Sequence, residues 1–292
     1  MKLFLCLLSL VVLGLPRAQA EPVVAGQTLY DLPLEELVRV QVPLQADVGT
    51  RDGAHTALHA IVPTDVYTTE QLLSVGEMGL AYALAALVPG FNHPRPSIAD
   101  GTDHAPPFTL RSLSPDQVLV LVNGKRLHQS SLLHTNGTIG RGSSSVDLNT
   151  IPLLAVERVE VLRDGAAAQY GSDAIAGVIN IILKSNSSGG SGSALYGQFK
   201  DRVGGKGNFG ARGQASVNQG FELPNDGFFS LSADLGIQDN SNVAGAVPAR
   251  TRIYFPVNGQ PDPRENGESR YRQIMGQPRS QTYNLAYNME LP

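Results

Sequence analysis

The chain has 292 residues, of which 42% are hydrophobic and 16% are charged, and its formal net charge is −4. This length allows one or two domains, and the lack of a basic excess argues against a nucleic-acid partner. Cys6 is the only cysteine, so a chain that has lost its first residues has no thiol for a disulfide or for a metal.

The first 20 residues have the pattern of a secretory signal peptide. Lys2 gives a positive start, Leu3–Leu15 is an apolar run too short to span a bilayer comfortably, and Ala18-Gln19-Ala20 is a small-x-small cleavage site. We expect cleavage after residue 20, with an uncleaved anchor as the alternative. The leader holds two basic residues, Lys2 and Arg17, and no acidic one, so cleavage leaves 20 basic and 26 acidic residues and a net charge of −6.

Residues 21–59 are mostly polar and predict a flexible segment. Within it, Asp31–Val42 (DLPLEELVRVQV) is acidic at first and then rich in β-prone residues. Two interpretations stay open for this stretch. It is either an extended strand offered to a partner sheet or an amphipathic turn packed on the domain that follows.

The next part of the chain predicts a short strand, a helix and two loops. Ala60–Val66 is the strand, and the apolar spacing of Thr69–Val88 predicts a helix that Pro89-Gly90 stops. Phe91–Pro107 is rich in proline, and His128–Ser145 is rich in glycine and serine, so both segments predict loops.

The stretch from Val118 to Lys184 predicts a compact β-rich unit. Val118–Val122 is a continuous apolar run that ends at Asn123-Gly124, a tight hairpin signal. Val156–Leu162 alternates and ends at Asp164-Gly165, and a segment of small residues then leads to the strand Val178–Leu183.

Beyond a Gly/Ser linker at 186–193, residues alternate apolar and polar over four segments. The apolar positions include Phe209–Val217, Phe229–Ile237 and Tyr283–Leu291 at every second residue, and Leu195, Gly197 and Phe199 oppose Tyr196, Gln198 and Lys200. Asn225-Asp226-Gly227 predicts a tight turn, and Asp239–Ser280 predicts a long loop between strands. Strands of this kind suit a lipid-facing barrel or a soluble sandwich with one buried face, and periodicity alone does not separate the two.

Four blocks of this sequence resemble the plug domain of TonB-dependent outer-membrane receptors, in the family's order and spacing. They are Val120–Lys125 (VLVNGK), Asp147–Pro152 (DLNTIP), Glu157–Gly165 (ERVEVLRDG) and Gln169–Lys184 (QYGSDAIAGVINIILK). The resemblance implies an α+β plug, a small mixed sheet with short helices, followed by the first strands of a transmembrane β-barrel. We therefore expect a signal peptide at 1–20, a flexible segment at 21–59, the plug at 60–185 and a partial barrel at 186–292.

The resemblance also implies a function. It implies a ligand-gated uptake receptor of the Gram-negative outer membrane, driven by a TonB–ExbB–ExbD energy-coupling complex and taking an iron–siderophore, haem, cobalamin or oligosaccharide. In this reading Asp31–Val42 is the TonB-coupling segment, with Glu35, Glu36, Leu37, Val38, Val40 and Val42 as its candidate residues. Only about four strands are predicted, whereas plugged transporters have about 22, so we expect a fragment that does not transport alone. The alternatives are a free-standing periplasmic plug-like binding protein and a non-functional truncated receptor product.

Site residues follow from the resemblance by position. The candidates for ligand binding lie in or beside the two plug loops and are His93, Arg95, His104, Arg111, His134 and Arg141. Solvated loop polarity is the competing interpretation of each. The residues expected to hold the plug structure are Asn123, Gly124, Arg158, Glu160, Arg163, Gly165, Tyr170, Gly171, Gly177 and Asn180.

Other chemistry finds little support in the sequence. Gly205–Gly210 matches G-x-G-x-x-G, but a strand and not a helix follows it. His55 and His59 are four residues apart without the glutamate or third ligand of a zinc site. No nucleophile or acid–base constellation emerges, so we predict no enzyme activity, no metal and no cofactor.

Overall fold

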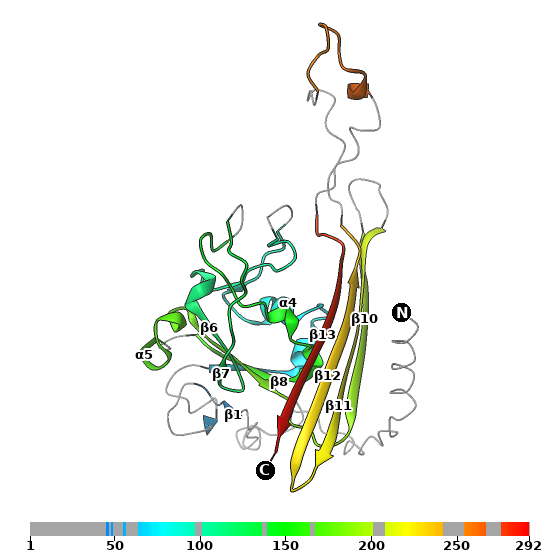
Figure 1. Cartoon of the computed structure of the whole chain (residues 1–292). Coiled ribbons are helices and arrows are strands. Elements are labelled where there is room, and N and C mark those ends of the chain that lie inside the picture. The colour runs from blue at the N-terminus through cyan, green and yellow to red at the C-terminus, as the bar shows by residue number, and fades with distance from the viewer. Residues whose placement is uncertain are drawn as a thin grey trace, which may run out of the picture.

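The computed structural model describes residues 45–46, 48, 55–56, 64–96, 101–135, 139–163, 167–200, 208–241, 254–266 and 276–291. The predicted leader, the candidate coupling segment Asp31–Val42, and the turn residues Asp164 and Gly165 lie outside these ranges. Among the described helices, none has the length and hydrophobicity needed to cross a bilayer. Figure 1 shows two parts side by side, a small mixed unit and a set of long strands. We call residues 64–184 the plug and β10–β13 the wall.

The plug is built on a five-stranded sheet with the strand order β3-β8-β9-β6-β7. Its strands are β3 (Thr64–Thr68), β6 (Val118–Val122), β7 (Lys125–Arg126), β8 (Val156–Leu162) and β9 (Gly177–Leu183). β6 and β9 are parallel, and the other pairs are antiparallel. The mixed sheet is therefore as predicted. β3 ends two residues after the expected strand Ala60–Val66, of which residues 60–63 are not described.

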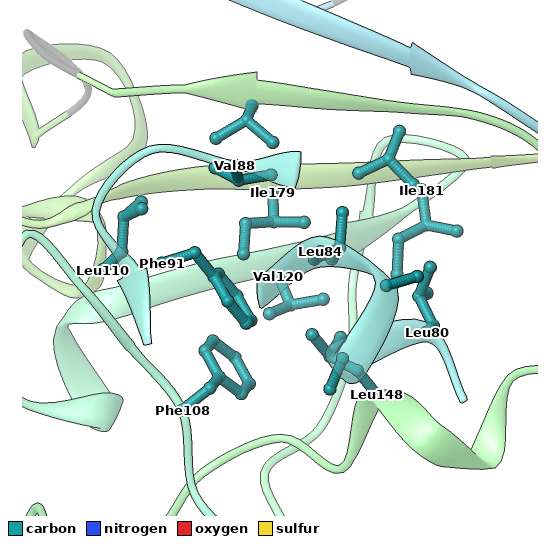
Figure 2. Packing of buried hydrophobic residues seen from close by; sticks show 14 of the residues in the cluster. Leu80, Leu84, Val88, Phe91, Phe108, Leu110, Val120, Leu148, Ile179 and Ile181 are labelled. Atoms are coloured by element: carbon teal, nitrogen blue, oxygen red, sulfur yellow. The ribbon is translucent and has the colours of Figure 1, made fainter. Parts of the chain in front are cut away.

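Both faces of the central strands are covered, which explains why Val118–Val122 and Val178–Leu183 are apolar at almost every residue. One face packs in the main core with Leu84, Phe108 and Ile179. The other face packs in a second cluster with Leu119, Leu121 and Val178. Figure 2 shows the main core, where α4 (Leu80–Leu87) lies over the sheet residues Val120, Ile179 and Ile181.

The turn between β6 and β7 confirms the predicted hairpin. Asn123 and Gly124 have φ angles of 48° and 73°, the left-handed conformation that a type I′ turn needs at both central residues. Asparagine and glycine are the residues that adopt this conformation at least cost.

The single helix predicted over Thr69–Val88 is wrong. The segment forms two helices, α3 (Thr69–Ser74) and α4, because Gly76 and Gly79 take φ angles of 68° and 98° between them. Positive φ is incompatible with a continuing right-handed helix, and two glycines in four residues make the break inexpensive. The Thr68 side chain and Gln71 cap α3, and α4 ends just before Pro89-Gly90, as predicted.

Short elements connect the sheet and its loops. They are β1 (Gln45–Ala46), β2 (His55–Thr56), β4 (Phe91–Asn92), β5 (Thr109–Leu110), η3 (Pro115–Gln117), η4 (Leu148–Thr150), η5 (Leu153–Ala155), α5 (Ala167–Tyr170), η6 (Ser172–Ala174) and η7 (Pro263–Asn266). β1 pairs with β2 and β4 with β5, and the rings of Phe91 and Phe108 stack at 5.0 Å beside the second pair.

The wall is an antiparallel meander of four strands. β10 (Gly190–Lys200), β11 (Asn208–Leu223), β12 (Gly227–Gln238) and β13 (Ser280–Glu290) pair in chain order. The predicted turn between β11 and β12 is present, with Asn225 and Asp226 at positive φ. In Figure 1 the strands run along one side of the plug, and residues 254–266, in orange, lie beyond the same end as the plug's loops. We call these plug loops, within residues 93–107 and 128–145, the apical loops.

Candidate functional site

The wall buries its polar face and exposes its apolar face. On the side toward the plug, the side chains of Asn218, Ser230, Ser232 and Asp234 are buried. On the other side, Tyr283, Leu285 and Tyr287 are 64%, 71% and 64% exposed. A soluble sandwich would do the reverse, so the arrangement agrees with the lipid-facing alternative of the sequence analysis.

β10 departs from the predicted apolar face. Leu195 pairs with Gln214, on the side of the sheet toward the plug, whereas Tyr196 pairs with Gly213 and is 74% exposed. The alternation of this strand was weak, because Leu195 and Tyr196 are both large and apolar in character. The register of its neighbour β11 decides which of the two faces outward.

A first set of contacts ties the plug to the wall near the apical loops. The carboxylate of Glu77, between α3 and α4, forms ion pairs with Arg95 at 2.7 Å and with Arg212 of β11 at 3.0 Å. Close by, the Asn284 side chain of β13 donates to the backbone carbonyl of Asn149 at 3.0 Å. Glu77 therefore links an apical loop and a wall strand through one carboxylate.

A second set of contacts lies at the other end of the interface. The Asn288 side chain of β13 donates to the carbonyl of Lys184 at 3.1 Å and accepts from Asn123 at 3.2 Å. The Ser230 hydroxyl donates to the side-chain oxygen of Asn186 at 2.6 Å. The turn at Asn123-Gly124 is thus both a hairpin of the plug and a contact point with the wall.

His93 and Arg95, two of the predicted ligand residues, are engaged within the protein. His93 is 7% exposed, and its Nδ1 lies 3.2 Å from the Pro107 carbonyl, to which it donates in the neutral Nδ1–H tautomer. The centre of its ring lies 4.4 Å from the centre of the Tyr82 ring. The guanidinium of Arg95 lies 4.3 Å from the centre of the same tyrosine ring. Burial lowers the pKa of His93 to about 4, so it is neutral at physiological pH.

His134 and Arg111 also make contacts within the protein. His134 is fully buried, and its backbone pairs with Ser143 and Gly142 across the second apical loop. Burial lowers its pKa, while the nearby Gly140 backbone acts in the opposite direction. Arg111 donates from Nη1 to the carbonyl of Arg163 at 2.8 Å, next to the ion pair that Arg163 forms with Asp65 at 2.7 Å.

His104 and Arg141 are exposed on the apical loops, one on each. Leu133, on the second loop, is 54% exposed and was missed by the sequence reasoning. The sequence could have indicated this exposed leucine, because a Gly/Ser-rich loop has no core of its own in which to bury an apolar side chain. His104, Leu133 and Arg141 are named the apical residues below.

The predicted structural residues form a network inside the plug. Glu160 is fully buried and accepts from Arg158 Nε at 2.9 Å and from Asn180 Nδ2 at 3.1 Å. Asn180 in turn accepts from the backbone N–H of Gly124 at 3.1 Å. Tyr170 packs at the edge of the second apolar cluster, Gly171 precedes η6 and Gly177 begins β9, while Gly165 lies outside the described residues.

No group of three or more His, Cys, Asp or Glu side chains in the described part of the chain is arranged to hold a metal ion. The prediction of no cofactor stays a prediction.

Comparison with known proteins shows which proteins this chain is similar to. Residues 57–178 match the sequence model described as TonB-dependent Receptor Plug Domain. The chain is 28% identical over 249 residues to the vitamin B12 transporter BtuB of Photobacterium profundum, covering 79% of this chain and 37% of that protein. It is 32% identical over 165 residues to the ferric enterobactin receptor PirA of Pseudomonas aeruginosa, covering 54% of this chain and 22% of that protein.

Two solved structures share the fold. The ferric enterobactin receptor PfeA in complex with BCV-L6 aligns with a TM-score of 0.50 and 23% identity, over 67% of this chain and 28% of PfeA. The ferric citrate transporter FecA in its unliganded form aligns with a TM-score of 0.50 and 17% identity, over 64% of this chain and 27% of FecA. The chain spans 37% or less of the length of these relatives. Over residues 57–178 the chain is therefore similar to the plug domain of TonB-dependent receptors.

Proposed function

We propose that the chain acts in ligand-gated uptake across the bacterial outer membrane, as the plug and wall strands of a receptor energised by a TonB-type coupling protein. The observation that carries this proposal is the orientation of the wall, whose polar face lies against the plug and whose apolar face is exposed. Relatives named as a vitamin B12 transporter and a ferric enterobactin receptor support the same function.

The outward face of the wall has the chemistry of a lipid-facing surface. Along β11, β12 and β13, the outward positions between Phe209 and Phe221, Phe229 and Ile237, and Gln281 and Leu291 hold no charged residue. The charged residues Arg212 and Asp234 lie at the alternate positions, toward the plug. Charge at the bilayer midplane costs about 2–4 kcal/mol in such barrels, so this distribution favours insertion.

The ligand is proposed to meet the plug at the apical residues. His104 and Arg141 offer hydrogen bonds and a positive charge, and Leu133 offers exposed apolar surface. A small molecule that combines apolar area with a few polar or anionic groups suits this set. Cobalamin and an iron–siderophore are both of this class, and they are the ligands in the names of the relatives.

Energy coupling is proposed to act through Asp31–Val42. An extended segment of this composition offers backbone N–H and C=O groups to the edge of a partner's sheet. The TonB–ExbB–ExbD complex is the partner that the plug family implies. Force on this segment would reach the plug through Val48, which follows the segment in the chain and packs against the plug sheet.

Binding and fractionation together test the proposal. Outer membranes from cells that express the full chain are titrated with cyanocobalamin and, separately, with ferric enterobactin. We expect one of the two to bind and the double variant His104→Ala, Arg141→Ala to weaken that binding at least tenfold. Lys125→Ala, which removes an exposed cation on β7 away from the apical loops, is the matched control and should leave affinity unchanged.

Two results would contradict the proposed function. Recovery of the chain in the soluble periplasmic fraction would favour the free-standing binding protein. Equal affinity of the double variant and of the control for the bound ligand would remove the apical residues from the site.

A further inference from the structure

The outward face of the wall contains a groove near the end of the strands that lies beside the apical loops, which we call the apical end. The volume of this groove is about 240 Å³. Gly213 of β11 pairs with Tyr196 of β10 on one side and with Ile237 of β12 on the other. The two large side chains are 74% and 55% exposed, so a residue without a side chain lies between two that stand out from the sheet.

A pair of opposite charges lies at the apical end of this groove. Arg279, just before β13, and Asp239, just after β12, both line the groove, and Nε of Arg279 lies 3.5 Å from Oδ1 of Asp239. The two side chains are 72% and 61% exposed. An ion pair this exposed contributes little to stability, so both groups can take a second partner at small cost.

The charged pair lies just beyond the apolar face of the wall. The outward positions of β13 and of the residue after it run from Gln281 to Leu291. At about 3.4 Å per residue and a tilt of about 35–45°, this run spans roughly 24–28 Å across a membrane. The apolar band of such barrels is about 25 Å tall, which puts Arg279 at the level of lipid headgroups.

Two tyrosines indicate the same level. The hydroxyl of Tyr196 donates to the side-chain oxygen of Gln198 at 3.4 Å, and that of Tyr283 donates to Gln281 at 3.4 Å. Each glutamine lies two residues from its tyrosine in the direction of the apical end. A tyrosine at a membrane surface keeps its ring in the apolar layer and its hydroxyl toward the polar one, so both rings lie where the apolar layer ends.

We propose that the groove binds a lipid headgroup of the phosphoethanolamine type, in which a phosphate is followed by a primary ammonium. Arg279 holds the phosphate and Asp239 holds the ammonium, while the apolar part of the lipid lies between Tyr196 and Ile237 and continues down the wall. The inference rests on the lipid-facing wall of the proposed function, and it adds a specific lipid site to that surface.

The two charges together favour a zwitterion over a simple anion. A phosphate bound to Arg279 alone would lie close to the carboxylate of Asp239, and this like charge opposes it. In a phosphoethanolamine headgroup the ammonium lies beside that carboxylate and removes the repulsion. The guanidinium donates to phosphate oxygens in a fixed fork, and a primary ammonium donates N–H bonds that the trimethylated ammonium of a choline headgroup lacks.

Fluorescence quenching by brominated lipids tests the site. The chain has no tryptophan, so Tyr196→Trp places a single fluorescent reporter in the groove. The full chain with this reporter is extracted from outer membranes into a neutral detergent and titrated with brominated phosphatidylethanolamine or brominated phosphatidylcholine. Because the two headgroups have the same net charge, we expect half-maximal quenching at an about fivefold lower mole fraction of phosphatidylethanolamine, and loss of this preference in Asp239→Asn and in Arg279→Gln.

Matched controls change the same charges elsewhere. Asp226→Asn removes an exposed carboxylate from the turn at the opposite end of the wall. Arg264→Gln removes an exposed guanidinium that pairs with Asp262, within the residues 254–266 that Figure 1 shows beyond the wall. Both controls should keep the preference for phosphatidylethanolamine.

The outcomes separate this site from the proposed function. Equal quenching by the two lipids would overturn the headgroup site and leave the lipid-facing wall in place. Stronger quenching by brominated phosphatidylglycerol than by phosphatidylethanolamine would also overturn it, because Asp239 would then have no part in binding. Absence of quenching by any of these lipids would contradict the lipid-facing wall itself, and the proposed function would fail with it.

Discussion

The plug and the wall bury opposite kinds of side chain. The plug buries apolar residues, and the wall buries polar ones. In the plug, Val120 and Ile179 are 1% and 0% exposed and lie under α4. In the wall, Leu285 is 71% exposed while Asn218 is 1% exposed. The central strands of the plug are apolar on both faces, and other parts of the chain cover these faces. The wall has one apolar face, and that face meets the surroundings. The comparison teaches that apolar alternation predicts a strand and its two faces, while the neighbouring elements decide which face is inside.

The largest expected effect is the loss of stability when a leucine of the plug core is replaced by alanine. The same replacement on the outer face of the wall is its comparison. Leu84→Ala in the plug core should cost about 2–5 kcal/mol, because it empties space that the surrounding core fills only partly. Leu285→Ala on the wall should cost less than about 1 kcal/mol in the plug's unfolding, because it leaves no cavity there. Pulse proteolysis of the plug across a urea series measures both. Equal losses of stability would break the distinction between the two sheets.

A smaller effect is expected from acid. The pKa of His93 is about 4 in the folded plug, below its ordinary value of 6.5, because burial disfavours the charged ring. The unfolded chain therefore binds the proton first, and stability is lost as pH falls from about 6.5 to about 4. The loss reaches on the order of 3 kcal/mol at the acid end of this window.

His93→Gln should flatten the pH dependence over that window relative to the unsubstituted chain. His104→Gln, which changes an exposed histidine, should not. Pulse proteolysis at matched pH values checks both variants, and parallel pH profiles for all three chains would contradict the buried, neutral state of His93.

The smallest of the three effects concerns the contact between the two parts. Glu77→Gln removes the charge that Arg95 and Arg212 share, and since Glu77 is 25% exposed we expect about 1 kcal/mol of lost plug–wall attachment. A double-mutant cycle with Arg212→Gln isolates the pair. Strictly additive effects would show that the ion pair does not hold the plug to the wall.

Much of the plug could be predicted because its signals are local. Asn123-Gly124 fixes a hairpin by backbone conformation alone. The apolar run Val118–Val122 and the alternating segment Val156–Leu162 coincide with β6 and β8. The helix at 69–88 failed because the apolar spacing persists through Gly76 and Gly79, whose positive φ angles divide it. The predicted outward direction of Leu195 was wrong, because the pairing of β10 with β11 decides which side of the sheet this side chain lies on.

The candidate site was harder to predict, because it depends on partners that are distant in sequence. His93, Arg95 and His134 have the residue types of a ligand site. Their roles are decided by Pro107, by Glu77 and by the fold of the second apical loop. Glu160 was expected to be structural, but its bond to Val48 spans 112 residues and has no signature in the spacing of either segment.

Collision accessibility on β13 tests the central claim most directly. Nitroxides are placed at Leu285→Cys on the outward face and at Ala286→Cys on the face toward the plug, each in the Cys6→Ala background and in native outer membranes. We predict that the label at position 285 is reached by oxygen and shielded from a water-soluble nickel chelate, as in lipid, and that the label at position 286 is shielded from both. Ready access of the nickel chelate to position 285 would contradict the lipid-facing wall and the uptake function built on it.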